Sequence, residues 1–112
     1  MKHFKSLTKH LPLLKTSEEE LESFIDDLYS FINVHPEYEL NSYIEILKRN
    51  NIEWGFESMK NADISQIDEV TVLALLVGAV RAERFCEGAL ISFLDGGHIN
   101  KWLTRLSELD EE

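Results

Sequence analysis

Four charged side chains stand close together in the second half of the chain, and their types could support binding or catalysis. Arg81, Glu83, Arg84 and Glu87 lie within seven residues of one another. Two guanidinium groups suit a phosphate or carboxylate, because each presents a planar fork of N–H donors. A neighbouring carboxylate from Glu83 or Glu87 could act as a general acid or base. One interpretation is therefore an anionic ligand held by the two arginines.

The second interpretation of this cluster is structural, and we favour it. Opposite charges three or four residues apart pair on a helix surface, as Arg84 and Glu87 would. Breaking such a network where it is half-buried costs about 3–5 kcal/mol. Replacing Arg84 with Gln separates the two interpretations. Loss of binding at an unchanged melting temperature indicates a ligand site, whereas a large drop in melting temperature indicates an ion-pair network that joins helices.

His98 is a further candidate for a ligand site. It follows two glycines at the start of the last predicted helix. We expect a surface or capping role, and we keep the alternative that it lines a pocket beneath Arg81 or Arg84. Helical carboxylate metal sites usually include a Glu-x-x-His motif, which this chain lacks. The histidines show no ligand spacing, so we predict no metal site and no cofactor; they are His3, His10, His35 and His98.

No other familiar catalytic motif is present in the sequence. There is no Gly-rich phosphate loop, no nucleophile elbow and no zinc-ligand spacing. Cys86 is the single cysteine, and we expect it to pack as a small apolar side chain. As a nucleophile it would need a partner that stabilises the thiolate. The sequence therefore favours a non-enzymatic protein.

A long buried helix is predicted to carry the charged cluster. The run Val70–Val80 is apolar on every side except at Thr71, and a helix that is apolar all round requires burial in a core. The helical period continues through the charges, so we expect one central helix at about 68–87. Small residues recur along it every four positions and would let another helix approach closely; they are Ala74, Gly78, Ala82 and Cys86.

Helix-start and helix-end signals divide the rest of the chain. Ser17-Glu-Glu-Glu20 is typical of a capping box that opens a helix. Asp63 or Ser65 is expected to cap the central helix. Asn50-Asn51 indicates a helix end, because asparagine tolerates the left-handed conformation found there.

These segments together predict the fold class. Residues 51–62 are expected to form a connector held by aromatic side chains. The final segment has the apolar spacing of an amphipathic helix, and no segment predicts a strand. We therefore expect an all-α fold of about five helices around the central helix, forming one domain over residues 1–112. The final apolar positions are Ile99, Trp102, Leu103, Leu106 and Leu109.

Charge and composition exclude several classes of function. The net charge is −10 over 112 residues, which argues against a general nucleic-acid binder because phosphate contacts need Lys and Arg. The basic arm at residues 1–15 is too short to change this. No run reaches the roughly 18–20 apolar residues that span a bilayer. A lone cysteine fits a reducing compartment, so we expect a cytoplasmic protein.

Several motifs resemble those of a bacterial domain-of-unknown-function family of small helical proteins. The resemblance covers about residues 40–110 and implies a bacterial cytoplasmic setting without an assigned activity. The motifs are Arg81-Ala-Glu-Arg-Phe-Cys-Glu-Gly88, Gly97-x-Ile99, Trp102-Leu-x-Arg-Leu106, Asn51-Ile-x-Trp54-Gly55 and Ser58-Met-x-Asn-Ala-Asp63.

Two hypotheses for the function follow. The favoured one is a small interaction or regulatory module that acts through an unknown protein partner, with a homodimer as one form of that interaction. The alternative is a small-molecule binder or enzyme that holds an anionic group with Arg81 and Arg84 and uses Glu83 or Glu87 as acid or base. A pocket containing both arginines would favour the alternative.

Overall fold

The described part of the protein has an all-α fold. The computed structural model describes residues 4–11 and 18–110, and within these ranges it contains seven α-helices, three short 3-10 helices and no strand. The all-α prediction is confirmed, and five of the helices have at least seven residues. The predicted capping Ser17 lies outside the described residues. The α-helices are α1 (Lys5–Thr8), α2 (Glu18–Val34), α3 (Tyr43–Arg49), α4 (Phe56–Lys60), α5 (Glu69–Ala82), α6 (Ala89–Asp95) and α7 (His98–Asp110).

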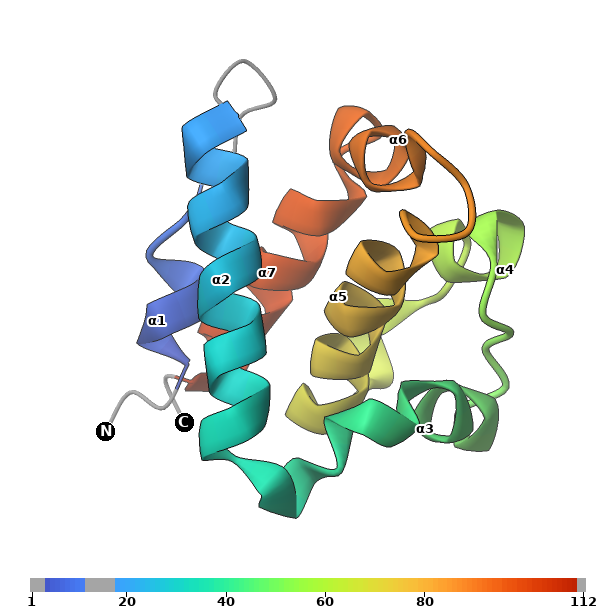
Figure 1. Ribbon diagram of the computed structural model, residues 1–112. Coiled ribbons are helices and arrows are strands. Elements are labelled where there is room, and N and C mark those ends of the chain that lie inside the picture. Colours follow the sequence, from blue (N-terminus) through green and yellow to red (C-terminus); the bar gives the residue numbers. More distant parts are fainter. Residues whose placement is uncertain (1–3, 12–17, 111–112) are drawn as a thin grey trace.

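Helix α5 is the centre of the molecule, with the other long helices arranged around it (Figure 1). Every residue from Thr71 to Val80 is buried. Helices α3, α6 and α7 pack directly against α5. Full burial of a Val or Leu side chain contributes roughly 1.5–3 kcal/mol, so this helix supplies a large share of the core. The predicted interior location of the apolar run is confirmed from Thr71 to Val80, and Val70 is partly buried against the core.

The start of α5 is fixed by Asp68. Its carboxylate accepts hydrogen bonds from the Thr71 main-chain N–H at 3.0 Å and from the Thr71 hydroxyl at 2.7 Å. The prediction that Asp63 or Ser65 caps this helix is wrong. Asp63 instead caps the short 3-10 helix η3 (Ile64–Gln66), where its side chain accepts from the Ser65 N–H. The chain turns between the two caps, so Asp63 caps η3 and Asp68 caps α5.

The end of α5 comes five residues earlier than predicted. The helix stops at Ala82 and a turn follows, so the expected central helix at 68–87 is too long. Gly88 has a positive φ of 89° and forms the N-cap of α6, a conformation that is favourable for glycine and strained for other residues. The residues from Glu83 to Gly88 therefore leave the helical path and form an exposed turn, which we call the 83–88 turn.

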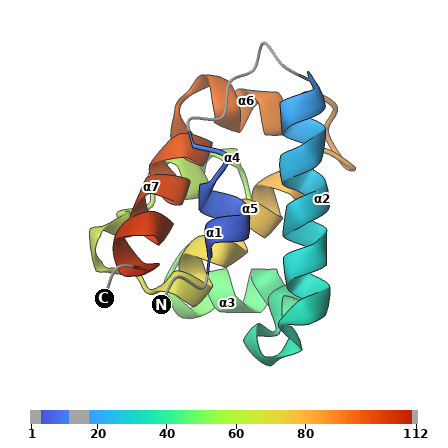
Figure 2. The same cartoon turned by 90° about the vertical axis from the view of Figure 1, so that its left-hand side faces the viewer.

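Helices α1 and α2 cover one side of the core, and α1 lies beside α7 (Figure 2). The Phe4 main-chain N–H donates to Asp110 Oδ2 at 3.2 Å. His10 Nε2 lies 2.7 Å from Asp27 Oδ2, and Lys9 Nζ lies 3.3 Å from the same oxygen. These contacts join the first described residues to both α2 and the last helix.

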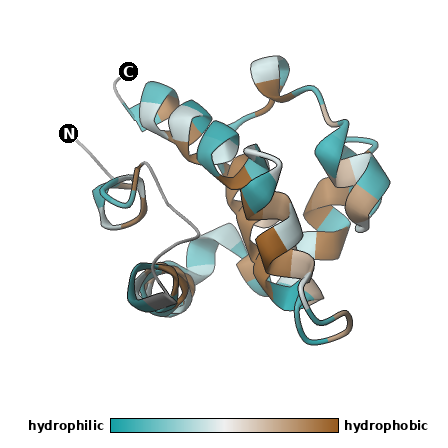
Figure 3. Cartoon of the chain, turned by 90° about the horizontal axis from the view of Figure 1, so that it is seen from above, coloured by the Kyte–Doolittle hydropathy of each residue, from teal (hydrophilic) through white to brown (hydrophobic). Residues whose placement is uncertain are grey.

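Polar and apolar residues are separated as a packed core requires. Apolar residues gather in the middle of the molecule and polar residues on its outside (Figure 3). The predicted stripe of the last helix is confirmed, because Ile99, Trp102, Leu103 and Leu106 are all buried, and Leu109 is partly buried against the core. Among the described residues, no helix combines the length and the apolar character needed to cross a membrane.

Candidate functional site

Arg81 joins three parts of the fold. It lies in the last turn of α5 and is half-buried. Its guanidinium carbon is 5.6 Å from the centre of the Tyr29 ring and 6.0 Å from that of Tyr43. Its Nη2 donates to Asn41 Oδ1 at 3.2 Å, while its buried Nε has no hydrogen-bond partner. Arg81 therefore connects α5 to α2 and α3 through aromatic rings and an amide rather than through carboxylates.

Glu83 holds the 83–88 turn closed. Its carboxylate accepts hydrogen bonds from the main-chain N–H groups of Gly88 at 2.9 Å and Leu90 at 3.0 Å. These donors lie at the start of α6, where helix N–H groups lack partners within the helix. A carboxylate is favourable there because it also faces the positive end of the helix dipole. Both oxygens of Glu83 are thus engaged in structure.

Arg84 and Glu87 lie on the 83–88 turn, and both are exposed. The helical spacing that predicted an Arg84–Glu87 pair does not exist here, because the helix has ended. Within the described part of the chain no hydrogen bond or ion pair links these two side chains, and the predicted network is absent there. Both charges face solvent beside Phe85, which is 75% exposed.

His98 begins α7 and lies among aromatic rings. Its ring centre is 6.4 Å from that of Phe93 and 6.2 Å from that of Trp102. Burial lowers the pKa of His98, and the positive charge of Lys60 lowers it further. Its Nδ1 is buried without a hydrogen-bond partner. His98 does not line the pocket described below, so its predicted role as a pocket residue has no support from this arrangement.

The structure does not bring the five predicted site residues together. In residues 4–11 and 18–110, no hydrogen bond or ion pair joins any two of their side chains. The same ranges hold no group of three or more His, Cys, Asp or Glu side chains that could bind a metal ion. The five residues are Arg81, Glu83, Arg84, Glu87 and His98.

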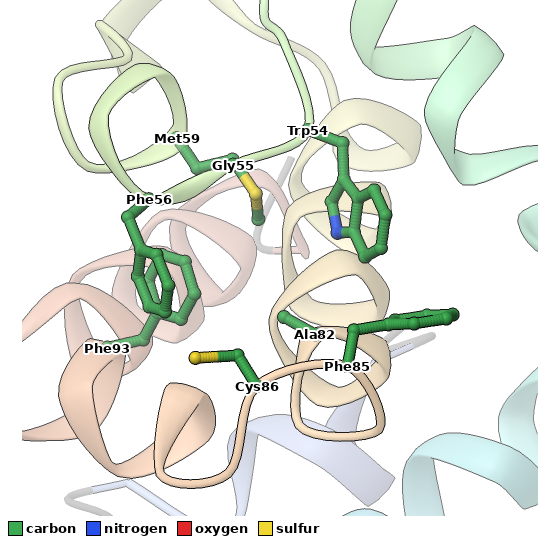
Figure 4. Close-up of a pocket in the computed structure, with 8 residues that line it drawn as sticks. All are labelled: Trp54, Gly55, Phe56, Met59, Ala82, Phe85, Cys86 and Phe93. Atoms are coloured by element: carbon green, nitrogen blue, oxygen red, sulfur yellow. The ribbon is translucent and has the colours of Figure 1, made fainter.

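A different feature, an open apolar pocket of about 150 Å³, lies against the 83–88 turn. Figure 4 shows its walls, which come from the connector before α4, from α4 itself, from the end of α5, from the turn and from α6. Every side chain that lines it is apolar apart from one thiol. The lining residues are Trp54, Gly55, Phe56, Met59, Ala82, Phe85, Cys86 and Phe93.

Trp54 forms one wall of the pocket and is held from three directions. Its indole N–H donates to the Gly78 carbonyl oxygen at 3.0 Å. Its ring makes edge contacts with Tyr43 and Phe85, at centroid distances of 5.8 and 5.5 Å. Gly78 is therefore the small residue that admits the connector: a Cβ there would lie 3.2 Å from Trp54 Cδ1. The predicted aromatic connector is confirmed, although it also contains the short helix α4.

The opposite wall is a stacked pair of rings. Phe56 and Phe93 lie 5.3 Å apart at an interplanar angle of 19°. The Lys60 ammonium group lies 5.3 and 5.5 Å from their centres and donates to the Ser92 hydroxyl at 2.8 Å. A cation over the rings and a hydrogen bond between α4 and α6 fix this wall in place.

Cys86 contributes the one thiol of the pocket. It is exposed rather than packed on the central helix, so the prediction of a buried small side chain is wrong. Its sulfur is turned toward the side of the pocket formed by Phe56 and Phe93 (Figure 4). The cause of the error is the early end of α5, which moves Cys86 from a helix face onto the turn.

Comparison with known proteins identifies the family. A model described as a family of unknown function, DUF6508, matches residues 16–112. The chain belongs to DUF6508. The match begins well before the expected start at residue 40 and therefore includes α2. No curated protein and no solved structure gave a match.

Every residue that lines the pocket lies within the DUF6508 segment. The sequence indicated the importance of this part of the chain, because two of the motifs quoted above contain Trp54, Phe85 and Cys86. The sequence predicts Trp54 as part of a connector held by aromatic side chains, and it places the candidate site at the charges instead. The available signal for the pocket was Phe85, an aromatic residue placed between charged neighbours just after a buried helix.

Proposed function

We propose that this DUF6508 protein is a non-enzymatic interaction module that receives an apolar side chain of a protein partner in the pocket beside the 83–88 turn. The observation that carries the proposal is the pairing of an open apolar pocket with a Phe85 ring that is 75% exposed. Large apolar groups left in water at one place mark interaction surfaces. Aromatic anchors in such pockets supply much of the binding energy of protein interfaces.

The chemistry of the pocket supports a side chain over a polar small molecule. Ligand sites for small molecules normally add a few polar groups that orient the ligand. Here the lining offers rings, a thioether, a methyl group, a glycine and one thiol. Engineered apolar cavities of about 150 Å³ bind benzene, so the volume suits one Phe ring or a branched aliphatic side chain.

The alternative, an anionic ligand on Arg81 and Arg84, stays a prediction without a supporting contact. The guanidinium of Arg81 is already in contact with Asn41 and two tyrosine rings. Both carboxylate oxygens of Glu83 accept main-chain hydrogen bonds. We place the interaction in the bacterial cytoplasm, which the free thiol and the family resemblance support.

The test selects peptides that bind the wild-type protein from a displayed library. The affinity of these peptides is then measured for a variant whose pocket is filled. In Cys86→Trp, the indole replaces a thiol turned into the pocket. The matched control is Ser23→Trp, which adds the same side chain at an exposed position on α2. We expect selected peptides to share one Phe, Leu or Met anchor, to lose at least about tenfold in affinity for Cys86→Trp, and to bind Ser23→Trp as they bind the wild type.

A direct probe of the pocket is toluene. We expect saturating toluene to slow the alkylation of Cys86 by N-ethylmaleimide in the native protein, since the ring and the reagent compete for the same space. Peptides that bind Cys86→Trp as tightly as the wild type, together with unchanged alkylation in toluene, would contradict the proposal.

A further inference from the structure

We infer that the partner is a second copy of this chain, and that the two copies exchange their Phe85 rings, each ring entering the pocket of the other copy. This inference rests on the proposed function of the pocket. In a two-fold symmetric dimer the same patch serves both copies, so the patch must contain both the inserted group and the cavity that receives it. The surface around the 83–88 turn meets this requirement.

The inserted group and the cavity are adjacent and matched in size. Phe85 is 75% exposed, and its ring lies against Trp54 on the rim, away from the open middle of the pocket (Figure 4). The cavity of about 150 Å³ is of the size that accepts one benzene ring. A benzyl side chain therefore projects beside a cavity that fits a benzyl side chain.

The charges on the turn are also self-complementary. Arg84 and Glu87 flank Phe85 and Cys86, both are exposed, and neither pairs with a described residue. A two-fold axis that exchanges the Phe85 rings brings the two turns together in opposite directions. Arg84 of each copy then faces Glu87 of the other, which gives two ion pairs of the kind that fix register and orientation in an interface.

The dimer is expected to be weak. Each chain carries a net charge of −10, so two copies repel at low salt. At 0.15 M ionic strength the Debye length is about 8 Å, and only the charges within the patch still matter. Two rings and two ion pairs form an interface below the roughly 800 Å² per partner of stable complexes. Association is therefore reversible and depends on concentration.

Sedimentation equilibrium at 0.15 M salt, at protein concentrations up to the millimolar range, tests the inference. We expect the mass to rise from 13.0 kDa toward twice that value. Phe85→Ala should weaken association by about thirtyfold or more. Val34→Ala is the matched control, because Val34 is 67% exposed on a different part of the surface, and it should dimerise as the wild type does.

Charge exchange tests the pairing itself. Arg84→Glu and Glu87→Arg should each abolish self-association. In a dimer of either variant, positions 84 and 87 carry charges of the same sign at both of the places where they face each other. A mixture of these two variants should associate, since every facing pair is then of opposite sign. The double variant, whose net charge equals that of the wild type, should recover the homodimer. All three replace exposed side chains, and an unchanged thermal unfolding curve confirms that they fold.

The outcomes separate this inference from the proposed function. A mass of 13.0 kDa at every concentration, or a dimer that persists in Phe85→Ala and in Arg84→Glu, overturns the homodimer. If peptides with an apolar anchor still bind and Cys86→Trp still excludes them, the pocket serves another protein. If toluene also leaves the alkylation of Cys86 unchanged, and peptides bind Cys86→Trp as tightly as the wild type, the proposed function itself is wrong.

Discussion

Glu83 accepts a hydrogen bond from the main-chain N–H of Gly88 at 2.9 Å, across the turn that links α5 to α6. The same carboxylate reaches the Leu90 N–H at 3.0 Å. One side chain thus satisfies donors at the start of α6 and sets the position of Phe85 and Cys86 between them. The shape of the pocket depends on this contact, although Glu83 does not line the pocket.

Removing the Glu83 carboxylate should loosen the turn and open the pocket. We expect Glu83→Ala to lower the free energy of unfolding by about 1–2 kcal/mol, the usual effect of losing a helix-start cap. Urea denaturation measures this loss, and faster alkylation of Cys86 reports the looser turn. Glu83→Gln is the control, because its one remaining acceptor oxygen should retain part of the stability. Equal stability of Glu83→Ala and the wild type would show that the contact does not hold the turn.

A substitution at Gly78 tests how firmly Trp54 is held in the wall of the pocket. A Cβ at this position would lie 3.0 Å from Met59 Cε and 3.2 Å from Trp54 Cδ1. The Met59 methyl group can move, whereas the indole is held by a hydrogen bond and two ring contacts. We expect Gly78→Ala to cost about 1 kcal/mol net, since strain of about 1–3 kcal/mol exceeds the gain in helix propensity of up to about 1 kcal/mol.

The matched control for Gly78 is Gly55→Ala. An added Cβ there meets no atom within 4 Å, so the change in unfolding free energy should stay within about 0.5 kcal/mol. Both variants are compared by urea denaturation with Trp fluorescence. A Gly78→Ala protein that is more stable than the wild type would indicate that Trp54 can shift freely.

Asp68 should be an important cap, because it begins the buried helix. Asp68→Ala removes the acceptor for the Thr71 N–H and hydroxyl and should cost about 1–2 kcal/mol in unfolding free energy. Asp68→Asn keeps the acceptor oxygen and should retain most of the stability. Thermal and urea unfolding of the pair measure the difference. An equal loss in both variants would assign the effect to the charge rather than to the cap.

His98 gives the stability a dependence on pH. Burial, followed by the nearby Lys60 charge, lowers the pKa of His98 below its ordinary value of 6.5. The unfolded chain therefore binds a proton at a higher pH than the folded chain does, so the contribution of His98 is complete above pH 6.5. That contribution decreases as the pH falls below 6.5, until the folded protein also takes up the proton.

The measurement is urea denaturation at several values between pH 7.5 and 5. His98→Gln, which cannot titrate, should show a smaller decrease in stability over this range than the wild type. Parallel curves for the two proteins would mean that the pKa of His98 is the same in both states.

The sequence predicts the fold well where the apolar pattern alone decides it. Burial of α5 follows from a run that is apolar on every side, and the buried stripe of α7 follows from the helical spacing of its apolar residues. The end of α5 could not be predicted in this way. Arg, Ala and Glu are good helix formers, and residues 81–84 carry no local stop signal. The helix ends because Glu83 binds N–H groups five and seven residues ahead, a choice that depends on Gly88 adopting a positive φ.

That one error also hid the candidate site. With the helix extended to residue 87, Cys86 lies on the ridge of small residues and Phe85 lies within the helix, so no pocket is predicted. The sequence points to the acidic and basic residues instead, because charges that continue an apolar helix must be paired or solvated. In the structure those charges shape or flank the 83–88 turn. Phe85 and Cys86, which lie between them, are exposed and form part of the candidate interaction surface.

Thr71 gives the central helix a preferred rotation about its own axis. The hydrophobic effect has no direction, so by itself it does not fix the rotation of an all-apolar helix relative to the neighbouring helices. The Thr71 hydroxyl donates to Asp68 and accepts from Asn50 Nδ2 at 3.0 Å, while the same Asn50 amide also donates to the Ile46 carbonyl oxygen. This polar relay between α3 and α5 acts together with the hydrogen bond from the Trp54 indole to the Gly78 carbonyl oxygen to set one rotation of the helix, which determines the face that meets the pocket.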